Sequence, residues 1–407
     1  MIIIEILLFS LLGIIVGVIL GLLPGLHLNN LLPLFVSLTL LIPNPHYLVV
    51  FIVSIAIAQV LTSFIPSIFL GAGDGDSNSL SILPGHRLLL EGRGYEAIRL
   101  TVIGGFAALI ISIVVVLFFG NYFALLYSII RPYIAYPLLA VILFMMFSEK
   151  QIKKILYAGL IIFLSGVLGI LVLNSSLVPS QNALFPTFAG LFAISTLITS
   201  ITDKAKIPKQ EVDTELKTSK FNITKAIVLG VVAGVLVGLL PAVGVSQAAT
   251  FMQYIGGLGE ARTFLVTLAG INTANEVISL NSLYLISNPR SGASVAIERI
   301  LPTITFNEVL LFLGVIFFAS GIVVPITLFL GRTVPKFLIK INYTVLSTIV
   351  IFFLTIMISL ITGIYGLLIG LTATGIGLLC TYTGVRRSNC MGILLIPSVL
   401  FFTGLNP

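Results

Sequence analysis

Two aspartates, Asp74 and Asp76, stand among glycines in the segment GAGDGDSNS, directly after a long apolar run. Carboxylates inside a bilayer are costly, so such residues usually line the path of an ion or a substrate. Glycines let a ligand approach the backbone closely, and oxygens of Asp, Ser and Asn suit a hard cation such as Na⁺. We therefore take Asp74 and Asp76 as candidate coupling-ion ligands, and Ser77 and Asn78 as candidate substrate ligands. A loop in water beyond a helix end is the alternative for this segment.

The letters GAGD, which end at Asp74, also match the G-x-G-D pattern of intramembrane aspartyl proteases. That chemistry needs two carboxylates from different membrane segments, because they share a proton and activate water together. The other aspartates are Asp76, which is too close in sequence, and Asp203 and Asp213, which lie in a polar segment. No HExxH, GxSxG or Walker motif is present. We therefore expect no enzyme, no catalytic residue and no metal site, and the protease stays a disfavoured alternative of another class.

A second polar cluster lies in the letters GINTANEVISLNS. Glu276 is the only acid between Glu260 and Glu298, and an acid in an apolar setting is a candidate ligand for a proton or Na⁺. Its polar neighbours are candidate substrate ligands: Asn272, Asn275 and Asn281. The alternative for Glu276 is a salt bridge at a helix end, with Arg262 or Arg290.

Arg290 is itself a candidate anion ligand. The fork of a guanidinium suits a carboxylate, which it binds through two parallel hydrogen bonds. We therefore add Arg290 and its neighbour Ser291 to the candidate substrate ligands. A loop charge that sets membrane topology explains Arg290 equally well.

Two proline-containing breaks interrupt apolar runs, in LLPGLHLNN at Pro24 and in LLPAVGVSQ at Pro241. Proline lacks an N–H and clashes with the preceding turn, so a regular helix should break at both places. Inside a membrane, broken backbone needs protein or a water-filled cavity around it, and the freed N–H groups favour an anion. The residues that follow the breaks are candidate substrate ligands: Gly25, His27, Asn29 and Asn30, and Gly244, Ser246 and Gln247. A kinked helix with polar residues at the headgroup level is the alternative.

Membrane-spanning helices must position these groups. The chain has 407 residues, of which 58% are hydrophobic and only 9% charged, more apolar than a soluble domain. Apolar runs close to the length of a membrane span, roughly 20 residues, recur along it. These runs are 1–23, 47–70, 100–119, 155–173, 223–240, 309–330, 345–361 and 364–379. We predict an all-α polytopic integral membrane protein with about ten to twelve transmembrane or re-entrant helices.

The longest polar stretch divides this single membrane domain near its middle. We expect residues 1–201 to form membrane repeat 1, 202–225 an inter-repeat linker and 226–407 membrane repeat 2. Pro241 lies 217 residues after Pro24, and Gly17 and Gly21 match Gly234 and Gly238 in the same register. Two halves with matching helix breaks are typical of transporters, so we predict two structural repeats in inverted orientation.

The net charge of +7 does not indicate nucleic acid, because no basic stripe interleaved with aromatic residues is present. Lys and Arg in short loops set membrane topology instead, and the Lys-rich linker 202–225 favours a cytoplasmic position. Cys380 and Cys390 are too few for a disulfide framework. We expect a multi-pass protein of the cell membrane whose surroundings are the lipid bilayer.

The order of these landmarks resembles the large membrane subunit of tripartite tricarboxylate transporters, the TctA family. The Pro-Gly-Leu-Gly segment of that family is similar to LLPGLHL, its Ile-Pro-Gly-Glu-Pro-Ala-Ser segment to IFLGAGDGDSNSLSILPG, and its Leu-Phe-Pro…Gly-Leu-Phe-Gly segment to ALFPTFAGLFAIST. Its second-half Pro-Gly-x-Gly and Glu-Ala-x-Asn-Asn-Ala segments are similar to LLPAVGVSQAA and INTANEVISLN. His27 and Ala242 replace glycines of the family, and AGDGD replaces its Pro-Gly-Glu-Pro core. The chain therefore resembles a divergent, short branch.

The resemblance implies a secondary active transporter, a symporter that moves a small organic anion, such as a di- or tricarboxylate, together with Na⁺ or H⁺. It implies no cofactor beyond that coupling ion. It also implies a small membrane subunit and a solute-binding protein as partners, although the departures leave open whether this branch keeps them. A polyprenyl-phosphate translocase is the alternative transporter, since broken helix ends also suit a phosphate headgroup.

Overall fold

The structure of the chain is a computed structural model. It describes residues 2–23, 28, 31, 35, 39, 42, 44–71, 76–133, 135–149, 151–175, 178, 182–202, 208–211, 215–239, 244–257, 260–338 and 343–405.

The described residues form helices and no strands, which confirms the predicted all-α class. The helices before the linker are α1 (Ile2–Leu22), α3 (Pro45–Thr62), α4 (Phe64–Phe69), α5 (Asp76–Leu90), α6 (Gly94–Phe119), η2 (Gly120–Tyr122), α7 (Phe123–Ile130), η3 (Arg131–Tyr133), α8 (Ala135–Phe147), α9 (Ile152–Asn174), α10 (Leu184–Phe188), the π-helix η4 (Ala189–Ile194) and α11 (Ser195–Thr202). Those after it are α12 (Lys220–Leu239), α13 (Val245–Ile255), α14 (Ala261–Leu280), α15 (Ser282–Ile286), α16 (Gly292–Ile300), α17 (Phe306–Leu338), α18 (Tyr343–Thr383), η5 (Arg387–Met391) and α19 (Gly392–Thr403).

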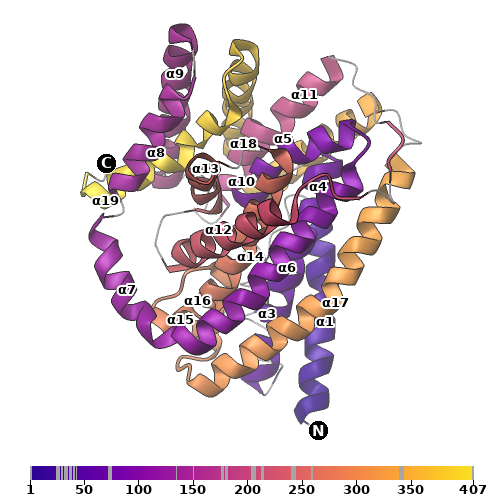
Figure 1. The fold of residues 1–407 in the computed structure, drawn as a ribbon, viewed down its shortest axis with the longest axis vertical. Coiled ribbons are helices and arrows are strands. Elements are labelled where there is room, and N and C mark those ends of the chain that lie inside the picture. Colours follow the sequence, from indigo (N-terminus) through magenta and orange to yellow (C-terminus); the bar gives the residue numbers. More distant parts are fainter. Residues whose placement is uncertain are drawn as a thin grey trace.

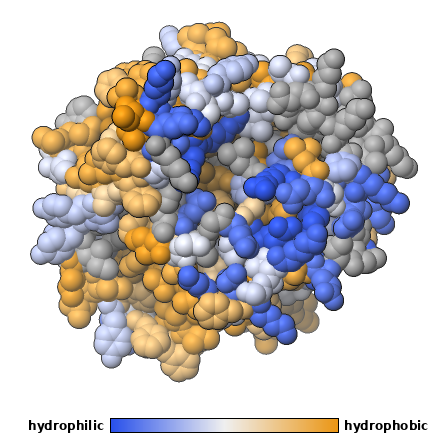
Figure 2. All heavy atoms as spheres, turned by 45° about the horizontal axis from the view of Figure 1, so that its top comes forward, coloured by the Kyte–Doolittle hydropathy of each residue, from blue (hydrophilic) through white to orange (hydrophobic). Residues whose placement is uncertain are grey.

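Among the described residues, 7 helices are long and apolar enough to cross a membrane. They cover Ile3–Leu22, Pro45–Phe69, Gly94–Ile129, Ile152–Asn174, Lys220–Leu239, Phe306–Phe337 and Thr344–Thr383. Three shorter apolar helices, Ala135–Phe147, Leu184–Thr199 and Arg387–Thr403, accompany them. The chain is therefore a polytopic membrane protein. Figure 2 shows apolar residues over the left and lower flanks of the molecule and hydrophilic residues gathered towards the middle and right of that view.

Helix α14 lies at the centre of the packing (Figure 1). It packs along α12 and α6, and it also contacts α3, α5 and α13. Helices α1, α3 and α17 form one flank of this core, whereas α8, α9, α18 and α19 pack together at the other end of the molecule. Residues from both halves of the chain thus surround α14.

Glycines bring α1 against α3 and α12 against α14 in the same way. A Cβ on Gly13 would stand 2.5 Å from the Phe51 carbonyl oxygen, and one on Gly21 would stand 3.1 Å from that of Gln59. The partner numbers rise together, so α1 and α3 run in the same direction. The corresponding contacts of α12, by Gly230 with Thr267 and by Gly238 with Asn275, give the same relation to α14. The connecting segment of each pair must therefore lead the chain back along the core, and in the second half it contains α13.

The first core helices of the two halves, α3 and α14, run in opposite directions. Helix α6 runs parallel to α14, because Gly104 contacts Val266 and the starts of both helices are joined by Glu96 and Arg262. Helix α17 runs parallel to α3, since His46 and Glu308 join their starts. Helix α17 is antiparallel to α6, with Gly331 near its end against Ile98 near the start of α6.

Helix α18 doubles back at Gly363, which has a left-handed φ of 65°. A Cβ on Gly370 would stand 3.4 Å from the Ile358 Cδ1 atom, although a straight helix holds residues 12 apart at about 18 Å. The two arms therefore lie side by side. They match the apolar runs 345–361 and 364–379 that the sequence separates at this glycine.

Candidate functional site

One face of α14 is polar, although the helix is buried at the centre of the protein. Two faces of α14 are occupied by packing: Ile271, Ala274 and Ile278 contact the glycines of α12, and Thr273 contacts Gly105 of α6. Residues spaced by four and three share a helix face, so the third face carries Asn272, Glu276 and Ser279. The remaining neighbours of α14 are α3, α5 and α13, which are the helices beside the predicted polar breaks.

The amides of α14 are buried among these helices. Asn272 has 8% of its surface exposed and Asn281 has 1%. The Asn275 carbonyl oxygen Oδ1 accepts a hydrogen bond of 3.3 Å from the Ser279 hydroxyl, and Asn281 Nδ2 donates one of 2.8 Å to the Val277 carbonyl. Asn281 Oδ1 has no hydrogen-bond partner in the part of the chain that the structure describes. Buried polar atoms of this kind leave donors and acceptors for a polar ligand.

Glu276 is partly buried on this face, and no described cation forms an ion pair with it. Arg262, one of the two partners weighed for a salt bridge, instead binds Glu96 and lies 3.8 Å from Glu91. A carboxylate without a fixed cation is suited to take up a proton or Na⁺. The role of Glu276 as a coupling-ion ligand stays a prediction, and its Arg262 alternative is removed.

The residues after the second break lie next to this face. Helix α12 ends at Leu239, two residues before Pro241, which is itself outside the described residues. Helix α13 begins at Val245, directly after Gly244, and packs on α12, α14 and α5. Ser246 in its first turn is fully buried. Gln247 belongs to the same turn, and its side chain lies outside the described part. The first turn of α13 therefore presents helix N–H groups close to α14.

Gln59 of α3 is a site residue that the sequence motifs did not reveal. It is 5% exposed, and its Oε1 atom accepts a hydrogen bond of 3.0 Å from the backbone N–H of Leu28, four residues after Pro24. Gln59 and Asn275 hold the same place in the two halves, because their carbonyls face Gly21 and Gly238, which are 217 residues apart. Applying that spacing to the letters AQVLTS would have identified Gln59.

Gln59 and Asn275 lie at similar depths in the core. Each comes 14 residues after the first residue of its helix, Pro45 in α3 and Ala261 in α14, which is about 21 Å along an α-helix. The two helices run in opposite directions, so each residue sits near the middle of the helical core. This is the depth at which transporters of repeated architecture hold their substrates.

The remaining first-half candidates cannot be placed on this face. Asp76 begins α5, a neighbour of α14, and Ser77 and Asn78 follow in its first turn, but their side chains are outside the described part. The other first-half candidates lie wholly outside the described residues: Pro24, Gly25, His27, Asn29, Asn30 and Asp74.

Arg290 lies apart from the polar face, beyond the end of α14 and after the short helix α15. Its guanidinium is 4.9 Å from the centre of the Tyr127 ring, a cation–π contact with α7. Its Nε and Nη2 atoms are buried without a hydrogen-bond partner among the described residues. These two atoms form the edge that binds a carboxylate through two hydrogen bonds. Ser291 caps α16 instead, since its hydroxyl accepts from the Ser294 N–H.

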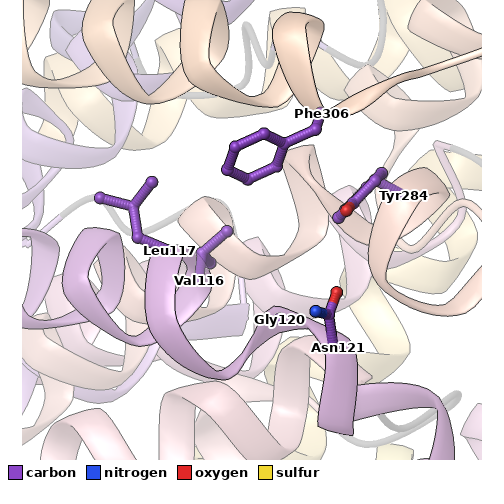
Figure 3. Close-up of a pocket in the computed structure, with 6 residues that line it drawn as sticks. All are labelled: Val116, Leu117, Gly120, Asn121, Tyr284 and Phe306. Carbon is purple, nitrogen blue, oxygen red and sulfur yellow. The ribbon is translucent and has the colours of Figure 1, made fainter.

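A cavity of about 270 Å³ opens at this same end of the core, where α6 ends and α17 begins. Its lining includes Val116 and Asn121 on one side, with Tyr284 and Phe306 opposite (Figure 3). Asn121 and the Tyr284 hydroxyl supply polar groups, whereas the other side chains are apolar. The cavity therefore lies where a solute would approach from the end of the helices, not at their middle.

Arg387, a second deeply buried cation, is fully explained by structure. Its Nη1 atom donates to the Phe192 carbonyl at 3.3 Å and to the Ser195 hydroxyl at 3.0 Å, and Nη2 donates to the Thr381 hydroxyl at 2.6 Å. The π-helix η4 leaves carbonyl oxygens without their usual partners, and Arg387 satisfies one of them. It therefore joins η4, α18 and η5, and it is no candidate for substrate binding.

Comparison with known proteins agrees with this arrangement. The family model described as "Tripartite tricarboxylate transporter TctA family" matches residues 7–392. A protein of Methanocaldococcus jannaschii, described as "Uncharacterized protein MJ1079", is 33% identical over 410 residues, which cover 97% of this chain and 98% of that protein. No solved structure matches the chain. The model covers nearly all of the chain, including both polar breaks and the polar face of α14, so the chain belongs to the tripartite tricarboxylate transporter TctA family.

Proposed function

We propose that the protein is a secondary active transporter of a small organic anion, with di- and tricarboxylates as the substrate class and Na⁺ or H⁺ as the coupling ion. The observation that carries this proposal is the polar face of α14, where Glu276 lies beside buried amides without a paired cation. Membership of a transporter family supports the transport function. The substrate and the ion follow from the chemistry of the face.

The first turn of α13, with Ser246 and Gln247, supplies N–H groups and a positive helix end for the carboxylate groups of the substrate. Asn272, Asn275 and Gln59 add amide donors at the same depth. Glu276 holds the coupling cation, whose charge offsets that of the bound anion. Substrate and ion therefore stabilise one another in a low-dielectric site, which couples their movement.

The site is built by two inverted repeats, 1–201 and 226–407, joined by the linker. The opposite directions of α3 and α14, and of α6 and α17, support this arrangement. Short helices α4 and α15 support it too, because each is followed by a left-handed residue, Gly71 and Ser287, 216 residues apart. In such transporters one site between the repeats is exposed to the two sides in turn.

Arg290 is a second anion ligand of this transporter, at the end of the core and outside the polar face of α14. Its free guanidinium edge and the neighbouring cavity would hold a carboxylate on its way to that face. Systems of the family usually combine the large subunit with a small membrane subunit and a solute-binding protein, which we propose as partners in the cell membrane, with the linker on the cytoplasmic side.

The decisive experiment is uptake of radiolabelled citrate and succinate into proteoliposomes, under an imposed Na⁺ gradient or pH gradient. Glu276→Gln removes the negative charge at constant size, so gradient-driven uptake should fall by about tenfold or more, the effect of about 1.4 kcal/mol on ion binding. Glu298→Gln is the matched control, because Glu298 is an exposed acid on α16, and its uptake should equal that of the unchanged protein.

Normal gradient-driven uptake by the Glu276→Gln protein would show that this acid does not couple transport. Movement of a polyprenyl phosphate across the bilayer, without uptake of either carboxylate, would replace the proposal with the lipid-phosphate translocase.

A further inference from the structure

The start of α14 is tied to the start of α6 by a buried ion cluster. The Glu96 side chain is fully buried and accepts hydrogen bonds from Arg262, by Nε at 3.0 Å and by Nη2 at 3.2 Å. Arg93, one turn earlier, donates to the same carboxylate, and so does the backbone N–H of Lys217 at 3.0 Å. Charged hydrogen bonds in so dry a place hold the two helices firmly together.

The linker closes over this cluster. Gln210 Nε2 donates to the Leu89 carbonyl at 2.9 Å, and its Oε1 atom accepts from the Gly94 N–H at 2.9 Å. Arg93 Nη2 donates to the Glu215 carbonyl at 2.7 Å. A segment that is polar in sequence is thus fixed across the ends of α5, α6 and α14, and this end of the core is closed.

The opposite end of the core carries a weaker ion pair. His46 Nε2 lies 3.6 Å from Glu308 Oε1, and their side chains are 38% and 20% exposed. The imidazole is charged only when protonated, and its Nδ1 lies 3.2 Å from Asn44 Oδ1. Exposed pairs contribute little to stability. The cavity lined by Val116 and Phe306 lies at this same end, where α6 finishes and α17 starts.

The two ion pairs occupy equivalent positions in the two halves. Arg262 is the second residue of α14 and His46 the second of α3, whereas Glu96 is the third residue of α6 and Glu308 the third of α17. Each pair therefore joins a core helix of one half to the long helix of the other half. Because α3 and α17 run against α6 and α14, the pairs lie at opposite ends of spans that cross the membrane.

We propose that Glu96–Arg262 and His46–Glu308 are the two gates of the transporter, and that they open in turn. The structure has the Glu96 gate closed under the linker, with a cavity present at the end guarded by His46. Opening of the Glu96 gate closes the His46 gate, because the halves move as rigid bodies around α3 and α14. The identity of the solute that passes rests on the function proposed above, whereas the gates themselves do not depend on it.

The test follows the accessibility of one engineered cysteine at each gate, in the full chain reconstituted in nanodiscs. Thr263→Cys reports on the Glu96 gate and Val309→Cys on the His46 gate, since both residues are buried beside the ion pairs at 3% and 0% exposure. Reaction with a charged methanethiosulfonate gives the rate. The native cysteines Cys380 and Cys390 are fully buried, so the protein without a reporter sets the background.

In the Arg262→Gln protein the reaction rate of Thr263→Cys should rise about tenfold and that of Val309→Cys should fall, since tenfold corresponds to about 1.4 kcal/mol between the two states. His46→Gln should change the two rates in the opposite sense. Arg262→Lys keeps the charge but loses the two-pronged contact, so its effect should be intermediate. Arg299→Gln, an exposed cation on α16, should change neither rate.

A rise at both reporters in Arg262→Gln and in Arg262→Lys would mean that the ion pair only stabilises the fold, and unchanged rates would mean that it does not restrain opening. Either result overturns the proposal. Opposite changes without uptake of any carboxylate would leave the gates standing and reject the proposed substrate class.

Discussion

Two glutamates, Glu96 and Glu276, show how surroundings decide the role of one residue type. Glu96 is fully buried, and its oxygens are saturated by two arginines and a backbone N–H, so it has no capacity for a ligand. Glu276 has buried amides as neighbours and no described ion pair. An acid of the first kind fixes helices, whereas one of the second kind binds a mobile ion.

At the same scale, Gln59 should matter for substrate binding although no motif contains it. Gln59→Leu removes the acceptor of the Leu28 N–H and an amide at the depth of Asn275, and an unpaired buried group costs about 1–3 kcal/mol. We expect the KM for carboxylate uptake to rise about tenfold, with little change in the amount of folded protein. Gln151→Leu is the control, because Gln151 is exposed and makes no side-chain cap bond. An unchanged KM would restrict Gln59 to a structural role.

At the scale of helices, glycine spacing determines how closely the core is packed. A Cβ on Gly234 would stand 2.6 Å from Ala274 Cβ and 2.7 Å from the Ile271 carbonyl oxygen, so α12 and α14 can only pair through glycine there. The same holds for Gly17 against Ala58 and Ile55 in the first half. The close approach brings the polar residues of α14 to the first turn of α13.

Gly234→Ala should therefore destabilise the protein more than its one methyl group suggests. The methyl group must push α12 away from α14, and overpacking of this kind costs about 1–3 kcal/mol. The melting temperature in detergent should fall by several degrees. Gly375→Ala is the matched control in α18, where a Cβ meets nothing within 4 Å, and its melting temperature should be unchanged or higher. Equal melting temperatures for the two variants would contradict the tight pairing of α12 with α14.

Much of this level can be predicted from the sequence, because apolar length and glycine register are local properties. The runs 1–23 and 223–240 correspond to α1 and α12, and the separation at Gly363 is where α18 turns. Gln59, the Glu96 cluster and the fixed linker could not be predicted in the same way. Their partners are more than 30 residues away in sequence, at Leu28, Arg262 and Leu89, and no period records such contacts.

At the scale of the molecule, the two halves cannot be separated as folded units. Helix α14 of the second half packs between α12 of its own half and α6 of the first, and linker residues 208–217 bind the turn before α6. The gate pairs likewise join one half to the other. The repeats are therefore interlocked, and the site exists only where they meet.

Splitting the chain between residues 204 and 205 should test this interlocking. Each fragment expressed alone leaves the buried face of α6 or α14 without its partner, so we expect aggregation or degradation. Fragments expressed together should co-purify through a tag on one of them and recover uptake, since the split falls outside the hydrogen-bonded part of the linker. A single fragment with the melting transition of the whole protein would contradict the interlocked core.

The turn at Gly363 has a consequence for the far end of the chain. Tyr343–Thr383 contains 41 residues, about 60 Å of helix, whereas a hydrocarbon layer is about 30 Å thick. Folded in two, each arm is long enough for one passage, and the pair returns the chain to the side from which it came. A straight α18 would make one passage instead, so this one residue sets whether the number of crossings is odd or even. The side of the bilayer on which α19 starts is therefore decided at a single left-handed glycine.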